Sequence, residues 1–137
     1  MRKTAILSIM LFVFALFTGC KKDKAPDPRD IYVATYRVTE TWTENGQLIT
    51  IPAFTMSVEK STQQSDKLLF INFSNYGAGI TAEATVSGTK ITISQQTLSN
   101  LKSITGTGTF ADPTLTFSYT ESTGNISNTI TATAKKI

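Results

Sequence analysis

The sequence predicts an all-β domain that begins at residue 31 and continues to residue 137. From Ile31 onward, apolar and polar residues alternate with period two, as in strands that have one buried and one solvated face. The polar positions are mostly threonine and serine, which suit the exposed face of an antiparallel sheet. No segment of this region has an apolar stripe at helical spacing. These three observations favour the all-β class.

Turn signals separate the alternating segments. They are Asn45-Gly46, Ser87-Gly88, Asp112-Pro113 and Gly124-Asn125, and the first of them is typical of a two-residue hairpin. Connections this short cannot hold parallel crossovers, so we expect an antiparallel up-and-down meander of about eight strands. Closure is the usual way in which such a sheet loses its edges, so the meander is expected to form a closed or nearly closed small barrel.

The inward faces of the expected strands follow from the alternation. In chain order they are Tyr32, Ala34, Tyr36 and Val38; Phe54, Met56 and Val58; Leu69, Ile71 and Phe73; Ile80, Ala82, Ala84 and Val86; Ile91 and Ile93; Leu115, Phe117 and Tyr119; Ile130, Ala132 and Ala134. Leu68 and Phe70 are then expected on the outer face. Residues 80–94 and 104–118 also align without gaps, which indicates an internal repeat in which each copy forms one hairpin.

The first 19 residues have the order of a secretory signal. Arg2 and Lys3 precede an apolar run from Ala5 to Phe17, and Thr18-Gly19 leads to Cys20. The run is shorter than the roughly 20 residues that a membrane span needs. The segment resembles the lipobox of bacterial lipoproteins, in which the cysteine is acylated and becomes the first residue of the mature chain. This resemblance implies a membrane anchor at Cys20, the only cysteine of the chain.

Residues 20–30 are expected to be the lipidated cysteine and a polar tether. Two prolines and seven charged residues between Lys21 and Asp30 cannot bury a core, which predicts an extended, solvated spacer. The residue after the cysteine is Lys21 rather than the aspartate that retains lipoproteins in the inner membrane. The expected location is therefore the outer membrane, with the domain facing either the periplasm or, as Lys21-Lys22-Asp23 suggests by its likeness to an export signal, the cell surface.

Residues 31–137 resemble the small lipocalin-like, or calycin-like, domains of envelope lipoproteins. The resemblance lies in the layout of DIYVATYRVTETW, DKLLFINFSNYG, TVSGTKITI and TGTGTF along the chain. It implies a monomeric barrel that binds a small apolar or mixed ligand.

Several classes of function find no support in the sequence. The chain has no histidine, and its one cysteine is expected to be acylated, so neither a metal site nor a catalytic triad is expected. Without Arg2 and Lys3, the 13 basic residues become 11 against 10 acidic ones, a net charge of +1 that gives no support to nucleic-acid binding. We expect no cofactor and no enzymatic activity.

One acidic residue stands out on an apolar face. Alternation turns Glu40 inward together with Tyr36 and Trp42, so it could be a polar group in a ligand cavity lined by Tyr32, Tyr36 and Trp42. Alternatively, the strand ends or bulges there and leaves the carboxylate in water at the barrel mouth. The second interpretation is favoured, because acids are almost never fully buried unless they are paired.

Two hypotheses for function follow. In the first, a non-catalytic envelope lipoprotein binds a small apolar or mixed ligand inside its barrel. In the second, the interior is filled, and the domain is a protein-interaction or structural module of the envelope that acts through its surface, as an inhibitor or an assembly partner. The volume of the barrel cavity distinguishes the two, because pockets for small ligands measure about 300 Å³ or more.

Overall fold

The computed structural model describes residues 24–137; the predicted signal peptide, the lipidation of Cys20 and the start of the tether lie outside this range. The strands of the described region are β1 Ala34–Glu44, β2 Gln47–Thr50, β3 Phe54–Lys60, β4 Lys67–Ile71, β5 Thr81–Ser87, β6 Lys90–Thr97, β7 Ser103–Ala111, β8 Thr114–Thr123 and β9 Ile126–Lys136. Two single-turn 3-10 helices, η1 (Asp30–Tyr32) and η2 (Phe73–Asn75), are the helical elements. Within residues 24–137, no helix has the length and hydropathy to cross a membrane.

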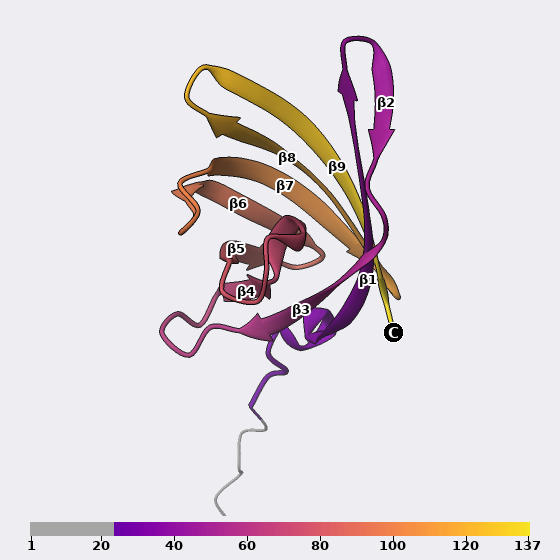
Figure 1. Cartoon of the computed structure of the whole chain (residues 1–137). Coiled ribbons are helices and arrows are strands. Elements are labelled where there is room, and N and C mark those ends of the chain that lie inside the picture. The colour runs from indigo at the N-terminus through magenta and orange to yellow at the C-terminus, as the bar shows by residue number, and fades with distance from the viewer. Residues whose placement is uncertain (1–23) are drawn as a thin grey trace, which may run out of the picture.

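The strands form a closed antiparallel barrel. The order is β2-β1-β3-β4-β5-β6-β7-β8-β9, and β1 also pairs with β9 (Figure 1). Eight strands therefore close the barrel, while β2 pairs only with β1 through the Asn45-Gly46 turn. The predicted meander and its closure are confirmed. The predicted repeat corresponds to the hairpins β5–β6 and β7–β8, which are neighbours in the sheet.

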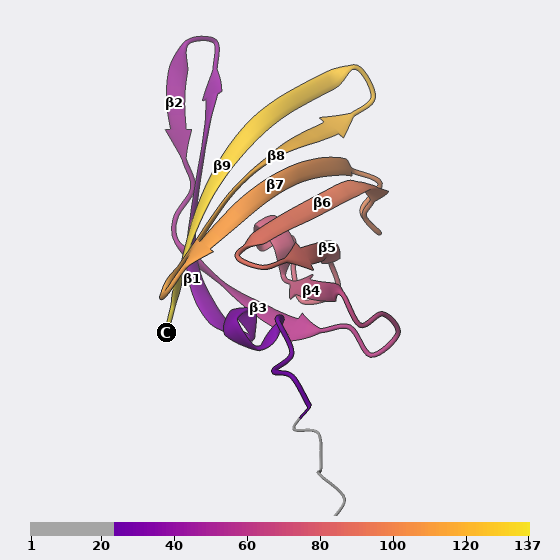
Figure 2. The same cartoon turned by 180° about the vertical axis from the view of Figure 1, so that it is seen from behind.

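Strands β1 and β9 separate at one end of the barrel. Their pairing runs from Tyr36 opposite Lys136 to Thr41 opposite Thr131 and continues no further. Beyond that point the β1–β2 hairpin leans away from the β8–β9 hairpin, as both views show (Figures 1 and 2). We call this the open end; the N-terminal segment enters at the opposite end.

The core fills most of the barrel interior. On strand β4, the inward face differs from the predicted one. Leu68 and Phe70 are fully buried, whereas Leu69 and Ile71 are only half-buried, so the predicted orientation of this strand was wrong. Leu68 and Phe70 lie opposite Ala84 and Ala82, whose small side chains leave room for them. Phe73 is buried as predicted, but it belongs to η2 because the chain leaves the sheet after Ile71.

Two glycines on β7 leave space inside the barrel for aromatic side chains of the neighbouring strand β8. Gly106 lies opposite Tyr119, and Gly108 lies opposite Phe117. A Cβ atom at Gly106 would come within 2.6 Å of the Tyr119 Cβ, and one at Gly108 within 2.5 Å of the Phe117 Cβ. Small residues on these inward faces therefore accommodate large neighbours, the second of which belongs to a cluster with Phe70 and Phe73.

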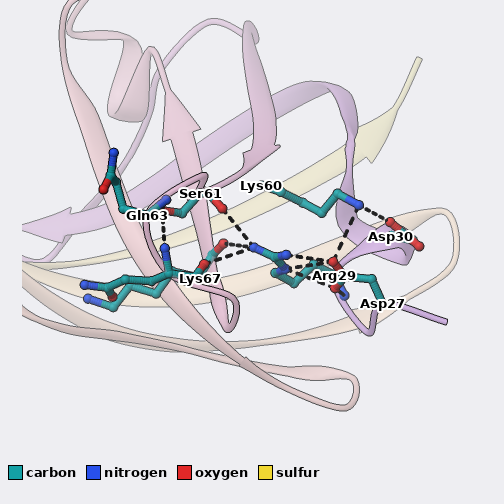
Figure 3. A network of polar contacts seen from close by, with 8 residues as sticks. Asp27, Arg29, Asp30, Lys60, Ser61, Gln63 and Lys67 are labelled. Carbon is teal, nitrogen blue, oxygen red and sulfur yellow. Dashed lines mark hydrogen bonds and ion pairs between the residues drawn. The ribbon is translucent and has the colours of Figure 1, made fainter. Parts of the chain in front are cut away.

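The end of the predicted tether docks on the barrel, in contrast to the expected solvated spacer. The Arg29 guanidinium donates hydrogen bonds to the main-chain oxygens of Ser61 (3.0 Å) and Lys67 (3.3 Å) in and beside the β3–β4 loop, and it pairs with Asp27 at 2.7 Å (Figure 3). Lys60 forms ion pairs with Asp27 and Asp30. These contacts hold residues 27–30 against the end of the barrel opposite the open end.

Candidate functional site

A pocket of about 290 Å³ lies at the open end of the barrel. It is lined by Glu40, Trp42, Ile51, Ser74, Tyr76, Lys102, Glu121, Asn128 and Ile130. Trp42 comes from β1, whereas Asn128 and Ile130 come from β9, so the pocket lies where these two strands separate. The apolar walls are Trp42, Ile51 and Ile130, and the other side chains supply polar groups. The hollow is of the size and mixed composition that suit a small ligand.

Glu40 forms the floor of this pocket and is only 1% exposed. Its Oε2 accepts a hydrogen bond from Ser74 Oγ at 2.9 Å. Its Oε1 lies 3.1 Å from Tyr119 Oη, which is also 2.8 Å from Ser74 Oγ. The favoured prediction, that Glu40 lies in water at the mouth, was therefore wrong. Strand β1 continues past Glu40 without a bulge, and two hydroxyl groups satisfy the buried carboxyl group.

A left-handed backbone conformation brings Ser74 into the barrel. Ser74 has φ 52° and ψ 29°, and its neighbours Asn72 (φ 63°) and Asn75 (φ 58°) also lie in the left-handed region. Such angles cost about 1 to 2 kcal/mol for a residue such as serine, and they occur often at functional sites. The Asn72 side chain fixes the turn by donating to Thr55 O at 2.7 Å and accepting from Gly77 N at 2.8 Å.

A charged group borders the pocket above Glu40. Lys102 Nζ lies 2.6 Å from Glu121 Oε1 and 2.8 Å from Tyr76 Oη, and Tyr76 donates a hydrogen bond to the other oxygen of Glu121. Lys102 Nζ also lies 4.4 Å from the centre of the Tyr76 ring. The positive charge of Lys102 is therefore already matched by Glu121, which is only 9% exposed.

The environment shifts the ionisation of these groups. Burial raises the pKa of Glu40, and the charge of Glu121 acts in the same direction, against the hydrogen bonds from Ser74 and Tyr119. Burial and the neighbouring Glu40 raise the pKa of Tyr119. Burial and the hydrogen bond to Glu121 raise the pKa of Tyr76. Burial opposes the charge of Lys102, but hydrogen bonds to Glu121 and Tyr76 outweigh it and raise the pKa of this amine.

The structure brings together two of the four residues predicted to line a cavity. Glu40 and Trp42 both line the pocket. Tyr32 and Tyr36 are fully buried farther along the barrel, where the Tyr32 hydroxyl donates to Gly88 O at 2.9 Å and the Tyr36 hydroxyl donates to Tyr32 O at 2.8 Å. Burial raises the pKa of Tyr36 to about 12. These two tyrosines do not line the pocket.

The sequence reasoning missed the residues that surround Glu40. Tyr119 was expected in the core, but nothing in the chain indicated that its hydroxyl group would meet a carboxyl group 79 residues away. Ser74 carries no sequence signal, since its position depends on a left-handed backbone. Within residues 24–137, no cluster of three or more His, Cys, Asp or Glu side chains could hold a metal ion.

Comparison with known proteins identifies the fold. No protein-family model and no curated protein matches the chain. Among solved structures, the chain is similar to a crystal structure described as a "putative outer membrane protein" from Bacteroides fragilis. The TM-score is 0.52 with 22% sequence identity, over 81% of this chain and 53% of that one. The similarity shows a shared fold, and the chain spans about half the length of that protein.

Proposed function

We propose that the protein is a non-catalytic lipoprotein of the bacterial cell envelope that binds a small ligand of mixed apolar and polar character at the open end of its barrel. The observation that carries the proposal is the pocket, which combines the apolar walls of Trp42, Ile51 and Ile130 with a buried carboxyl group. At about 290 Å³ it lies at the lower limit of the volumes of ligand pockets.

The envelope location is supported by the start of the sequence and by the structural neighbour. The charged, apolar and small residues up to Cys20 have the order of a lipoprotein signal, and the neighbour from Bacteroides fragilis is described as a "putative outer membrane protein". Location at the outer membrane and anchoring through Cys20 are both part of the proposal.

Replacement of Cys20 by serine tests the anchor. We expect the Cys20→Ser variant to lose labelling by an alkyne fatty acid and to accumulate as an uncleaved precursor, because the acylated sulfur is lost. The measurement is in-gel fluorescence after labelling in a bacterial host, with electrophoretic mobility as the second readout. Ser8→Ala, a change within the apolar run, is the control and should label normally. Equal labelling of Cys20→Ser would exclude lipidation at this residue.

Titration with a neutral apolar probe tests the pocket. Trp42 is the only tryptophan, so its fluorescence reports directly on the pocket wall. We expect cyclohexylmethanol to change this fluorescence in a saturable way in the purified mature protein.

Replacement of Trp42 by alanine should weaken the binding of cyclohexylmethanol by about fivefold or more in calorimetry, since a large aromatic contact is lost. Its cost in stability should stay below the roughly 3 to 5 kcal/mol of a packed aromatic, because the side chain is only partly buried.

The opposite result would favour the second candidate, a protein-interaction or structural module. That result is a fluorescence response that does not saturate, together with a Trp42→Ala loss in the range of a packed aromatic. The exposed side chains Leu48 (71%) and Ile126 (69%), on the two hairpins that separate at the open end, are the observation that favours this candidate.

A further inference from the structure

The buried carboxyl group of Glu40 has no cation beside it. Among the residues that the structure describes, the ion pairs join Lys and Arg side chains to other acids, and none includes Glu40. Lys102 lines the same pocket, but it is held by Glu121 at 2.6 Å. A buried carboxylate is costly unless it is paired, so this group either carries a proton or receives a positive charge from outside the chain.

The hydrogen bonds around Glu40 need one more proton than the two hydroxyl groups supply. Three contacts link Glu40, Ser74 and Tyr119 in a ring: Ser74 Oγ to Glu40 Oε2, Glu40 Oε1 to Tyr119 Oη, and Tyr119 Oη to Ser74 Oγ. Each hydroxyl group has one proton to donate. All three contacts become hydrogen bonds only when Glu40 is protonated and donates to Tyr119. The geometry of this ring therefore favours a neutral carboxyl group in the pocket.

We propose that the pocket selects ligands that carry an ammonium group on a compact apolar body, and that binding exchanges the proton on Glu40 for the charge of the ligand. This inference rests on the proposed function of the pocket. In the exchange, the O–H bond of Glu40 breaks and the proton passes to solvent. The ammonium group then donates to the carboxylate, Ser74 continues to donate to it, and the Tyr119 hydroxyl, which no longer accepts from Glu40, turns its proton from Ser74 to the carboxylate.

The other groups around the pocket are compatible with a cation. Glu121 on β8 and Lys102 on the β6–β7 loop form an ion pair, so Lys102 leaves no net positive charge at the pocket wall. Tyr119 on β8 and Tyr76 after η2 remain neutral, because their pKa values are raised. Trp42, Ile51 and Ile130 provide apolar contact, and the indole face also attracts cations.

The exchange gives binding a pH dependence of defined sign. Since the pKa of Glu40 lies above its ordinary value of 4.5, the folded protein holds this proton at pH values where the unfolded chain has lost it. The empty protein therefore loses stability as pH rises from about 4.5 through the folded pKa. Affinity for an amine should rise with pH up to the folded pKa of Glu40 and then stay constant while the amine remains protonated, because no proton on Glu40 remains to be displaced.

Matched ligands provide the test. Cyclohexylmethylamine and cyclohexylmethanol have the same shape and differ in charge. We expect calorimetry on the mature protein to show that the amine binds at least about tenfold more tightly than the alcohol. This difference corresponds to one charge-assisted hydrogen bond. Repeating the titration in buffers of different ionisation enthalpy should show proton release below the folded pKa. Glu40→Gln should abolish both the preference and the proton release, and Glu59→Gln, an equal change in charge on the outer face, should alter neither.

Each outcome separates the two proposals. If neither ligand binds the wild-type protein, the proposed function of the pocket is wrong. If both ligands bind with equal affinity and without proton release, the pocket binds ligands but the inference about amines is wrong. Binding of the alcohol by Glu40→Gln shows that this variant is folded, and the proton release of the wild-type protein tests the exchange even if the variant does not fold.

Discussion

Replacement of Gly106 by alanine is expected to lower the free energy of unfolding by about 3 kcal/mol or more, at the upper end of what overpacking costs. The new Cβ would lie 2.6 Å from the Tyr119 Cβ and 2.7 Å from the Tyr119 Cα. Neither atom can move without shifting strand β8, because Tyr119 is paired on both sides, with Gly106 on β7 and Ile130 on β9. Urea denaturation followed by circular dichroism measures the loss.

The control for this substitution is Gly79→Ala in the loop before β5. No heavy atom lies within 4 Å of a Cβ at that position, and the backbone needs no positive φ there. We expect a change within about 0.5 kcal/mol. Equal and small effects of the two substitutions would contradict the close approach of β7 and β8 that the structure shows.

Truncation of Phe117 to alanine is expected to lower the free energy of unfolding by about 3 to 5 kcal/mol. Phe117 is 1% exposed, and its ring centre lies 5.8 Å from that of Phe70, 6.2 Å from that of Phe73 and 6.0 Å from that of Tyr119. The loss would combine the transfer of the aromatic ring to water with the cavity left among these three rings. Thermal or urea denaturation should show a cooperative transition at a lower midpoint.

The control for Phe117 is Ile126→Ala on the neighbouring strand. This side chain is 69% exposed, so we expect a change within about 0.5 kcal/mol. If Phe117→Ala cost no more than Ile126→Ala, the aromatic cluster would not be the centre of the core.

The fold could be predicted from local pattern because each strand reveals its faces by its own alternation. Tyr36, Val38, Phe117 and Ala132 were all expected inside, and all are buried. Prediction failed at Leu68 and Phe70, where four consecutive apolar residues make both faces look alike. There the small side chains of Ala82 and Ala84 on the next strand decide the orientation, and a pairing partner cannot be identified from one strand alone.

The candidate site could be predicted only in part. Alternation placed Glu40 and Trp42 on the same inward face, and both line the pocket. The burial of Glu40 depends on Ser74 and Tyr119, which are 34 and 79 residues away in the chain. The general rule against buried acids therefore gave the wrong answer, because the hydroxyl groups that satisfy Glu40 meet it only after the barrel has closed.

The docking of Arg29 on the barrel limits how far the domain can lie from a membrane anchor at Cys20. With residues 27–30 held on the β3–β4 loop, the chain between Cys20 and Asp27 could span at most about 25 Å. An acyl anchor at Cys20 would therefore keep the end of the barrel that holds Arg29 within about 25 Å of the bilayer, with the separated ends of β1 and β9 at the opposite end of the domain from the attachment point. The pocket would then lie at the end of the domain farthest from the anchor, where ligands that diffuse in water can reach it.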